Sequence, residues 1–222
     1  MTDNSSSYNS NIYDENIINT LPYYREYAEQ ILDIARTLGK DHMNWLDTGC
    51  GTGTLAVKVL ERFDNVSFTL CDPSADMLDV AKTKLQGRDI RYVNCASHEL
   101  PFSDEFDILT AVQCHHYYQP EDRKIAVRKC YDALKPSGVF ITFENIRMSA
   151  DESDSIAMKR WLNFQRDHGR SEDDVQKHAA RRGKVMFPIT IEEHIQLLRE
   201  CGFKTVDILW TAYLQAGFWA IK

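Results

Sequence analysis

The feature that most constrains this chain is a run of three glycines at alternate positions between two apolar stretches. Gly49, Gly51 and Gly53 follow a strand-like run that ends at Asp47, and an apolar helical pattern begins at Leu55. Glycine has no Cβ, so this turn can adopt positive φ angles and lets a ligand lie against the backbone. The N-terminus of the next helix offers unpaired N–H groups. The pattern therefore predicts a strand, a ligand-binding turn and a helix, with the Asp47 carboxylate facing the ligand.

The glycine spacing differs from the Gly-x-Gly-x-x-Gly pattern of dinucleotide folds, and no Lys-Ser/Thr pair of a phosphate loop follows it. A plain turn is the alternative at this point. A second buried strand is predicted over residues 66–71, and it ends at Asp72. An acidic residue about twenty positions after a glycine turn is placed to bind the two ribose hydroxyls of a nucleoside. Because no phosphate-binding cation accompanies it, a nucleoside without phosphates fits best.

In combination, these motifs resemble the first two motifs of class I S-adenosylmethionine-dependent methyltransferases, over about residues 40–145. The resemblance implies an α/β, Rossmann-like fold with a seven-stranded, mostly parallel sheet in the order 3-2-1-4-5-7-6. It further implies helices on both faces, a helical cap, S-adenosyl-L-methionine as cofactor and S-adenosyl-L-homocysteine as product. The matching residues are Asp47-x-Gly49-x-Gly51-x-Gly53 and Cys71-Asp72-Pro73-Ser74-x-x-Met77-Leu78.

The resemblance assigns the methionine end of the cofactor to Asp47 and the glycine turn, and the ribose to Asp72. One departure is Cys95, which stands where the family has an aspartate for the adenine amino group. Ala96 is expected to donate a backbone N–H to the adenine ring instead. The predicted cofactor-binding residues are Tyr24, Asp47, Gly49, Cys50, Gly51, Gly53, Asp72, Pro73, Met77, Cys95, Ala96, Ser97 and Gln113.

Two histidines follow the fourth predicted strand, residues 106–112. Ligands of open parallel sheets gather outside the carboxyl ends of the strands, which places His115 and His116 on the reactive rim. They are the candidate catalytic residues, as a base or a substrate contact; the alternative is that one of them only holds the loop. Methyl transfer from a sulfonium needs mainly alignment and exclusion of water, so a base is required only when the acceptor must lose a proton.

Two segments outside the motifs are predicted to cover the strand ends. Residues 1–11 are polar and serine-rich and are expected to be disordered, and residues 12–222 form one methyltransferase domain. Residues 12–38 are expected to act as a lid, with Tyr13 and Tyr24 over the cofactor. Residues 147–190 are expected to form a helical substrate cap; the alternative is a solvated charged surface with a tryptophan packed beneath it. The candidate substrate residues of the lid and cap are Tyr13, Arg160, Trp161, Arg181 and Arg182.

The C-terminal half resembles the carboxy-S-adenosylmethionine synthases of the tRNA wobble-uridine pathway. The likeness rests on residues 168–172, on Val185-Met186, on His194 and on residues 201–203. The arginine that would hold the additional cofactor carboxylate falls on Ala179, so the prediction is ordinary methyl transfer to a small-molecule acceptor. Two alternatives stay open: a tRNA-modifying or cofactor-modifying enzyme, and a non-catalytic S-adenosylmethionine-binding module.

Length, composition and charge limit the remaining classes of function and location. A chain of 222 residues can bury one substantial core, and its six scattered cysteines form no Cys-x-x-Cys pair. Reduced thiols, a cytoplasmic location and no metal site are the expectation. The net charge of −7 argues against a broad nucleic-acid footprint, although a local basic patch is left open, as is a homodimer. No apolar run has membrane-spanning length, so we expect no membrane partner.

Overall fold

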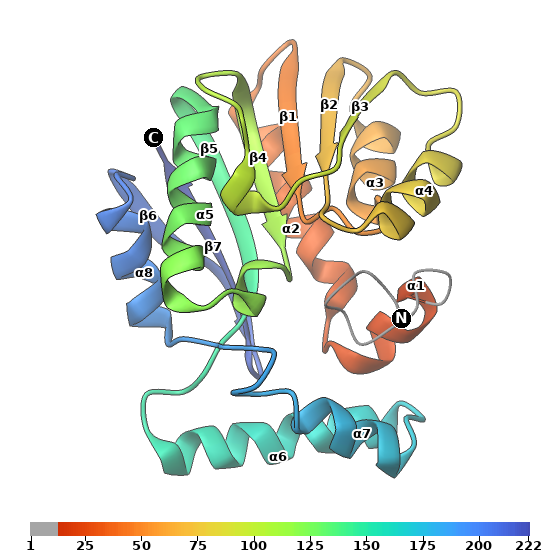
Figure 1. Cartoon of the computed structure of the whole chain (residues 1–222), viewed down its shortest axis with the longest axis vertical. Helices are drawn as coiled ribbons and strands as arrows, with labels where there is room; N and C mark the ends of the chain where they lie inside the picture. The colour runs from red at the N-terminus through yellow and green to blue at the C-terminus, as the bar shows by residue number, and fades with distance from the viewer. Residues whose placement is uncertain (1–12) are drawn as a thin grey trace.

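A seven-stranded sheet organises the computed structural model, which describes residues 13–222. The strand order is β3-β2-β1-β4-β5-β7-β6, with parallel pairing from β3 to β5 and antiparallel pairing of β7 with β5 and β6 (Figure 1). The predicted fold class and strand order are therefore confirmed. The strands are β1 Met43–Thr48, β2 Val66–Cys71, β3 Ile90–Val93, β4 Phe106–Val112, β5 Leu134–Asn145, β6 Thr205–Ala212 and β7 Gln215–Ile221.

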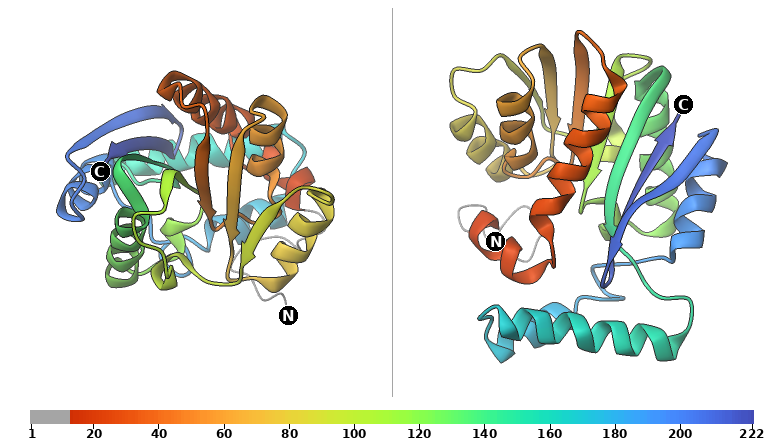
Figure 2. Two further views of the ribbon diagram at one scale, coloured as in Figure 1. Left: turned by 90° about the horizontal axis from the view of Figure 1, so that it is seen from above. Right: turned by 180° about the vertical axis from the view of Figure 1, so that it is seen from behind.

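Helices connect the strands and lie on both faces of the sheet (Figure 2). Several of their ends carry local capping signals: Ser74 caps α4 through the Met77 N–H, and Thr190 with Glu193 forms a capping box on α8. The helices are α1 Tyr13–Thr20, α2 Tyr24–Leu38, α3 Thr54–Arg62, α4 Ala75–Lys84, η2 Ser97–Glu99, η3 His115–Tyr117, α5 Pro120–Ala133, α6 Asp151–Asp167, α7 Glu172–Ala179 and α8 Ile191–Glu200.

Two apolar cores lie on opposite faces of the sheet. Successive side chains of a strand point to opposite faces, so Trp45 packs into one core and Leu46 into the other. The first core is covered by α2, α3 and α4, and the second by α5 and α8. Trp45 and Leu46 are both fully buried. The central strands are therefore fixed from both sides, and their carboxyl ends form a rigid edge.

Of the predicted lid and cap segments, α1, α6 and α7 lie beyond this edge, whereas α2 packs along one face of the sheet (Figure 1, Figure 2). α6 and α7 cross below the carboxyl ends of the parallel strands, and α1 lies beside them. The indole N–H of Trp161 in α6 donates a hydrogen bond of 2.7 Å to the carbonyl of Thr20 in α1. The two segments thus contact each other. The predicted tail at 1–11 and the side chain of Tyr13 lie outside the described residues.

Within residues 13–222, the helices are all too short or too polar to cross a membrane.

Candidate functional site

The glycine turn after β1 has the predicted left-handed backbone. Gly49, Gly51 and Gly53 have φ angles of 63°, 54° and 74°. A Cβ on Gly49 would lie 2.5 Å from the Cβ of Cys114, and one on Gly53 would lie 3.1 Å from that of Ala81. A Cβ on Gly51 would meet no atom of the described residues 13–222 within 4 Å. Gly49 and Gly53 are therefore required by packing, whereas Gly51 faces open space that a ligand can use.

Asp72 stands directly opposite this turn. Its carboxylate accepts hydrogen bonds from the Gly51 N–H at 2.8 Å and from the Ser74 N–H at 2.9 Å. The Asn94 amide donates to the Asp72 carbonyl at 2.9 Å. A carboxylate has about four acceptor positions, so it can accept hydrogen bonds from these backbone N–H groups and from two vicinal hydroxyls at the same time. The structure thus brings Asp72 to the glycine turn, as the ribose assignment requires.

Asp47 is the penultimate residue of β1, and its buried carboxyl accepts one side-chain hydrogen bond from within residues 13–222, donated by the Thr110 hydroxyl at 2.7 Å. Burial raises its pKa to about 7, the Thr110 hydrogen bond opposes the shift, and the negative charge of Asp72 adds to it. Two carboxyl groups therefore gather at the turn. Such a site attracts a cationic ligand, and a ligand with a sulfonium and an ammonium group fits this charge.

The residues predicted around an adenine follow β2 and β3. Met77 is buried in the first turn of α4, and Ser97 is buried with its hydroxyl 2.9 Å from that of Thr48. The Ala96 N–H, predicted to bind the adenine ring, donates to the Glu99 carboxylate at 3.0 Å. An adenine contact from this donor would therefore compete with Glu99. Cys95 is half-buried.

Two further predicted cofactor residues hold the backbone around the turn. The Cys50 N–H donates to the Cys71 carbonyl at 3.0 Å, which ties the turn to the end of β2. The Pro73 carbonyl accepts from the Asn94 amide at 3.0 Å. Both therefore lie at the carboxyl ends of β1 and β2, beside the glycine turn.

The N-terminal helices pack on the same turn. Asp14 of α1 accepts hydrogen bonds of 2.8 Å from the hydroxyls of Thr52 and Thr54, and it forms an ion pair with Lys84. Although burial would raise the pKa of Asp14, these hydrogen bonds lower it. Tyr24, a predicted lid residue, lines a cavity of about 30 Å³ with Leu55 and Val112, among others. That volume is enough for about one water molecule.

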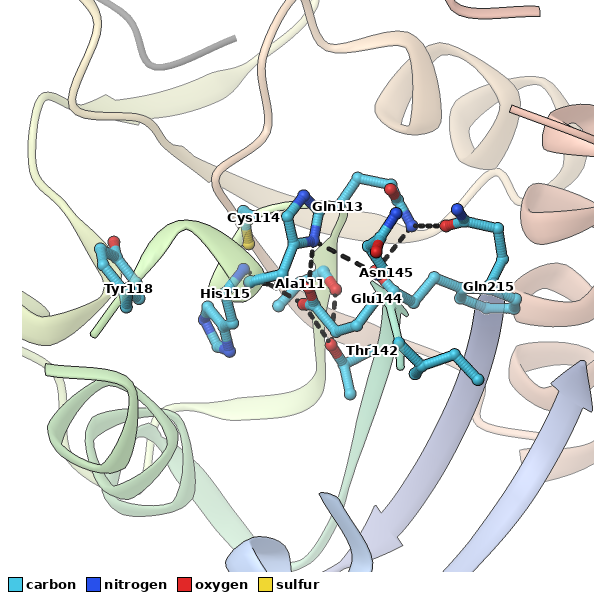
Figure 3. A network of polar contacts seen from close by, with 12 residues as sticks. Ala111, Gln113, Cys114, His115, Tyr118, Thr142, Glu144, Asn145 and Gln215 are labelled. Atoms are coloured by element: carbon cyan, nitrogen blue, oxygen red, sulfur yellow. Dashed lines mark hydrogen bonds and ion pairs between the residues drawn. The ribbon is translucent and has the colours of Figure 1, made fainter. Parts of the chain in front are cut away.

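The rim after β4 carries the two candidate histidines in η3, and Figure 3 shows the polar contacts around His115 and Glu144. His116 Nδ1 lies 2.7 Å from the Glu144 carboxylate, and both side chains are buried. His115 is also buried, but its Nε2 has no hydrogen-bond partner among the described residues, and burial lowers its pKa to about 4. Gln113 has a positive φ of 56° and donates its amide to Gln215 at 2.9 Å. The two histidines therefore have different surroundings.

Glu144 is a buried carboxylate of the rim that sequence reasoning does not single out. It is the penultimate residue of β5, is 1% exposed, and accepts hydrogen bonds from the backbone of η3. The signal that could find it is a carboxylate closing an otherwise apolar strand, residues 139–143. The same signal identifies Asp47 and Asp72 on β1 and β2.

The predicted cap residues do not gather at one point. Arg160 is exposed and lies 4.7 Å above the ring of Tyr213, and Trp161 is buried against α1. Arg182 donates to the Asp154 carboxylate at 2.8 Å and to Asn145 at 2.9 Å.

Arg181 contacts the rim itself. Burial raises the pKa of Tyr117 in η3 to about 12, and the hydrogen bond and charge of Arg181 oppose the shift. Among the predicted cap residues, Arg181 is therefore the cation that reaches η3, whereas Arg182 holds the cap together.

Comparison with known proteins adds three findings. A family profile described as a methyltransferase domain matches residues 46–138. The chain is 29% identical to a carboxy-S-adenosyl-L-methionine synthase of Wolinella succinogenes, covering 95% of this chain and 90% of the relative. It is 24% identical to a protein of the same name from Nautilia profundicola, covering 96% and 92%.

Solved structures share the fold at low sequence identity. A Leishmania major S-adenosylmethionine-dependent methyltransferase superimposes with a TM-score of 0.67 at 16% identity, covering 97% of this chain and 79% of that one. A putative O-methyltransferase from Nostoc punctiforme gives a TM-score of 0.62 at 20% identity, covering 88% and 56%. These likenesses concern the fold alone.

Proposed function

Since this chain carries a class I S-adenosylmethionine-dependent methyltransferase domain, we propose that it transfers the methyl group of S-adenosyl-L-methionine to a small-molecule acceptor. The observation that carries the proposal is the meeting of Asp47, Asp72 and the open side of Gly51 at one turn. A cofactor with two cationic groups and a ribose fits two carboxylates beside an exposed backbone.

In this proposal, each part of the chain has a distinct role. Asp47 and the glycine turn bind the methionine end, and Asp72 accepts hydrogen bonds from the ribose hydroxyls. Met77, Cys95 and Ala96 surround the adenine. When bound, the cofactor supplies a methyl group on positively charged sulfur. The acceptor binds on the rim formed by Gln113 and η3, where α6 and α7 exclude water.

A second candidate function follows from the names of the relatives. Both are called carboxy-S-adenosyl-L-methionine synthases, and this chain aligns with 92% and 90% of their lengths. A cofactor with an added carboxylate would need a cation at the rim. Ala179 cannot provide one, and Arg182 is bound to Asp154. Arg181, which contacts Tyr117, is then the residue that would bind the carboxylate. Mass spectrometry of the ligand that copurifies with the protein distinguishes the ordinary cofactor from a carboxylated one.

The test of the cofactor site is Asp72→Ala, measured by calorimetric titration of S-adenosyl-L-homocysteine. Losing charge-assisted hydrogen bonds to two hydroxyls costs about 3 kcal/mol, which weakens binding by about 100-fold. Asp79→Ala is the matched control, because Asp79 is an exposed carboxylate of α4 that pairs with Lys82. Unchanged affinity in Asp72→Ala contradicts the ribose assignment.

A further inference from the structure

Three amide side chains, which we call the amide cluster, lie together at the edge of the sheet where β4 and β5 end and β7 begins (Figure 3). Gln113 follows β4, Asn145 ends β5, and Gln215 begins β7. Asn145 and Gln215 are direct partners in the antiparallel ladder, so their side chains lie on the same face of the sheet. Asn145 is 1% exposed and Gln215 is fully buried. Amides buried to this extent need hydrogen-bond partners.

The hydrogen bonds of Gln113 fix the direction in which the Gln215 amide points. The side-chain nitrogen of Gln113 lies 3.3 Å from the Phe143 carbonyl, which can only accept a hydrogen bond. The same nitrogen lies 2.9 Å from the Gln215 side chain, so the Gln215 atom at this contact is its oxygen. The Gln215 nitrogen therefore points away from Gln113. It is buried and has no hydrogen-bond partner within residues 13–222.

The Asn145 amide is oriented in the same way by the cap. Arg182 Nη1 lies 2.9 Å from the Asn145 side chain, and a guanidinium group can only donate hydrogen bonds. The Asn145 atom at this contact is therefore its oxygen. Its side-chain nitrogen donates no hydrogen bond to any other residue in the described part of the chain. Two –NH₂ groups on paired residues thus remain available, and each offers two donors.

These donors match a ligand oxygen that accepts hydrogen bonds. Buried N–H groups in folded proteins nearly always have a partner, so the Gln215 nitrogen indicates a bound ligand or water molecule. A carbonyl oxygen has two lone pairs and can accept one N–H from Gln215 and one from Asn145. An ammonium group can only donate and is therefore excluded as the group that binds here.

The charges around the amide cluster favour a neutral carbonyl over a carboxylate. Glu144 precedes Asn145 in the chain and is 1% exposed. Burial would raise the pKa of Glu144, but the hydrogen bond from His116 lowers it to about 2, so Glu144 is ionised near pH 7. Arg182, the cation that contacts the cluster, already forms an ion pair with Asp154. A carboxylate ligand would therefore lie near the negative charge of Glu144 without a compensating charge from Arg182.

The amide cluster lies beside the proposed cofactor site and outside it. Asp47 and Asp72 lie at the carboxyl ends of β1 and β2, whereas the cluster belongs to β4, β5 and β7. The strand order places β4 between β1 and β5. Neighbouring strands are about 5 Å apart, so the ends of β1 and β5 are about 10 Å apart. A small molecule that binds the amides can therefore reach the glycine turn after β1.

We propose that the amide cluster binds a carbonyl oxygen of the methyl acceptor, and that the acceptor is an amide, lactam, ketone or ester. This inference rests on the proposed methyl transfer. Gln215 and Asn145 each donate a hydrogen bond to the carbonyl oxygen, while Gln113 and Arg182 hold the two amides in this orientation. The cluster thereby binds one end of the acceptor and leaves its nucleophilic atom to face the glycine turn.

The first test is nuclear magnetic resonance of the full-length protein with nitrogen-15-labelled side-chain amides and saturating S-adenosyl-L-homocysteine. The probes are pyrrolidinone, which is a lactam, pyrrolidine, which is the same ring without the carbonyl, and acetate. We expect pyrrolidinone alone to shift the side-chain N–H resonances of Gln215 and Asn145. Shifts with acetate that equal those with pyrrolidinone, or no shift with pyrrolidinone, overturn the proposal. The resonances are read in the unsubstituted protein, so this result is decisive even where a variant does not fold.

The second test replaces each –NH₂ group by an oxygen with almost no change in shape. Gln215→Glu and Asn145→Asp keep the oxygen that Gln113 or Arg182 binds and remove the donor. Each should weaken pyrrolidinone binding by at least about tenfold, while calorimetry should find the affinity for S-adenosyl-L-homocysteine nearly unchanged. Gln196→Glu is the matched control, because Gln196 is an exposed residue of α8 that bonds to Glu200. Unchanged pyrrolidinone affinity in both variants overturns the proposal.

The third test connects the amide cluster to methyl transfer. S-adenosyl-L-homocysteine formation is measured with pairs of phenols and of amines that differ only in a carboxamide group. The member with the carboxamide should have a KM at least about tenfold lower, and Gln215→Glu should raise that KM with kcat nearly unchanged. Equal KM values within every pair overturn the proposal. Failure of the unsubstituted protein to bind S-adenosyl-L-homocysteine, or absence of turnover while pyrrolidinone still binds, overturns the proposed methyl transfer instead.

Discussion

The carboxyl ends of β1 and β2, where we propose that the cofactor binds, and the predicted cap, residues 147–190, use their polar residues in different ways. At the carboxyl ends of β1 and β2, carboxylates face backbone N–H groups and open space. Asp72 accepts a hydrogen bond from the Gly51 N–H, and in the described part of the chain no atom lies within 4 Å of a Cβ on Gly51. In the cap, charged residues mainly bind one another: Arg182 pairs with Asp154, and Arg166 pairs with Glu172. The first arrangement prepares a site for a ligand, and the second maintains a shape.

This difference shows that charge alone does not identify a binding residue. Burial raises the pKa of Asp47, and the charge of Asp72 adds to the shift, so a cation that binds there would stabilise the ionised carboxylate. Arg182 also lies near the strand ends, but its guanidinium group already donates hydrogen bonds to Asn145 and Asp154. Three predictions test this contrast.

The largest effect is expected in the glycine turn. Gly49→Ala places a Cβ 2.5 Å from that of Cys114 at a φ of 63°, which should lower the free energy of unfolding by about 3 kcal/mol. The new Cβ in Gly51→Ala meets no atom of residues 13–222, so this variant should lower the free energy of unfolding by only about 1 kcal/mol. Its loss of cofactor-binding free energy should be larger than that. Urea denaturation and calorimetric titration of both variants check this. Equal stability losses in the two variants would contradict the division between packing and ligand-facing glycines.

A smaller effect is expected in the cap. Arg182→Gln removes a partly buried ion pair and the hydrogen bond to Asn145, and should lower the free energy of unfolding by about 2 kcal/mol. Cofactor affinity should remain unchanged. Arg166→Gln is the matched control, because its ion pair with Glu172 is exposed and should contribute less than about 0.5 kcal/mol. Loss of cofactor affinity in Arg182→Gln would show that the cap arginine belongs to the site.

The smallest effect is expected from pH. A pKa of about 7 means that Asp47 is mostly protonated at pH 5.5 and half ionised at pH 7. A cationic ligand binds the ionised form, so the affinity for S-adenosyl-L-homocysteine should rise by about tenfold over this range, in which the ligand's amino group stays protonated. Asp47→Asn should abolish the dependence. A titration that is flat with pH in the unsubstituted protein would remove Asp47 from the cofactor site.

Sequence reasoning reaches those parts of the candidate site whose residues lie close together in the chain. The glycine turn, Asp47 and Asp72 lie within residues 47–72, and the resemblance carried by these motifs predicts the complete sheet order. The contact of Glu144 with His116 joins β5 to η3, 28 positions apart in the chain, and no local pattern encodes it. The Arg182–Asp154 pair likewise depends on how α6 and α7 pack. Long-range packing decides these partners, and a sequence pattern does not record it.

The position of β7 has a consequence for how the chain is made. β6 joins the sheet only through β7, which pairs with β5 on its other side, so Gln215–Ile221 completes both neighbours at once. During synthesis, the ribosome must release these residues before the sheet can close. Until then, β5 presents an unpaired edge, which is a template for aggregation. A chain stopped before Gln215 should therefore depend on chaperones, because β5 then keeps its unpaired edge.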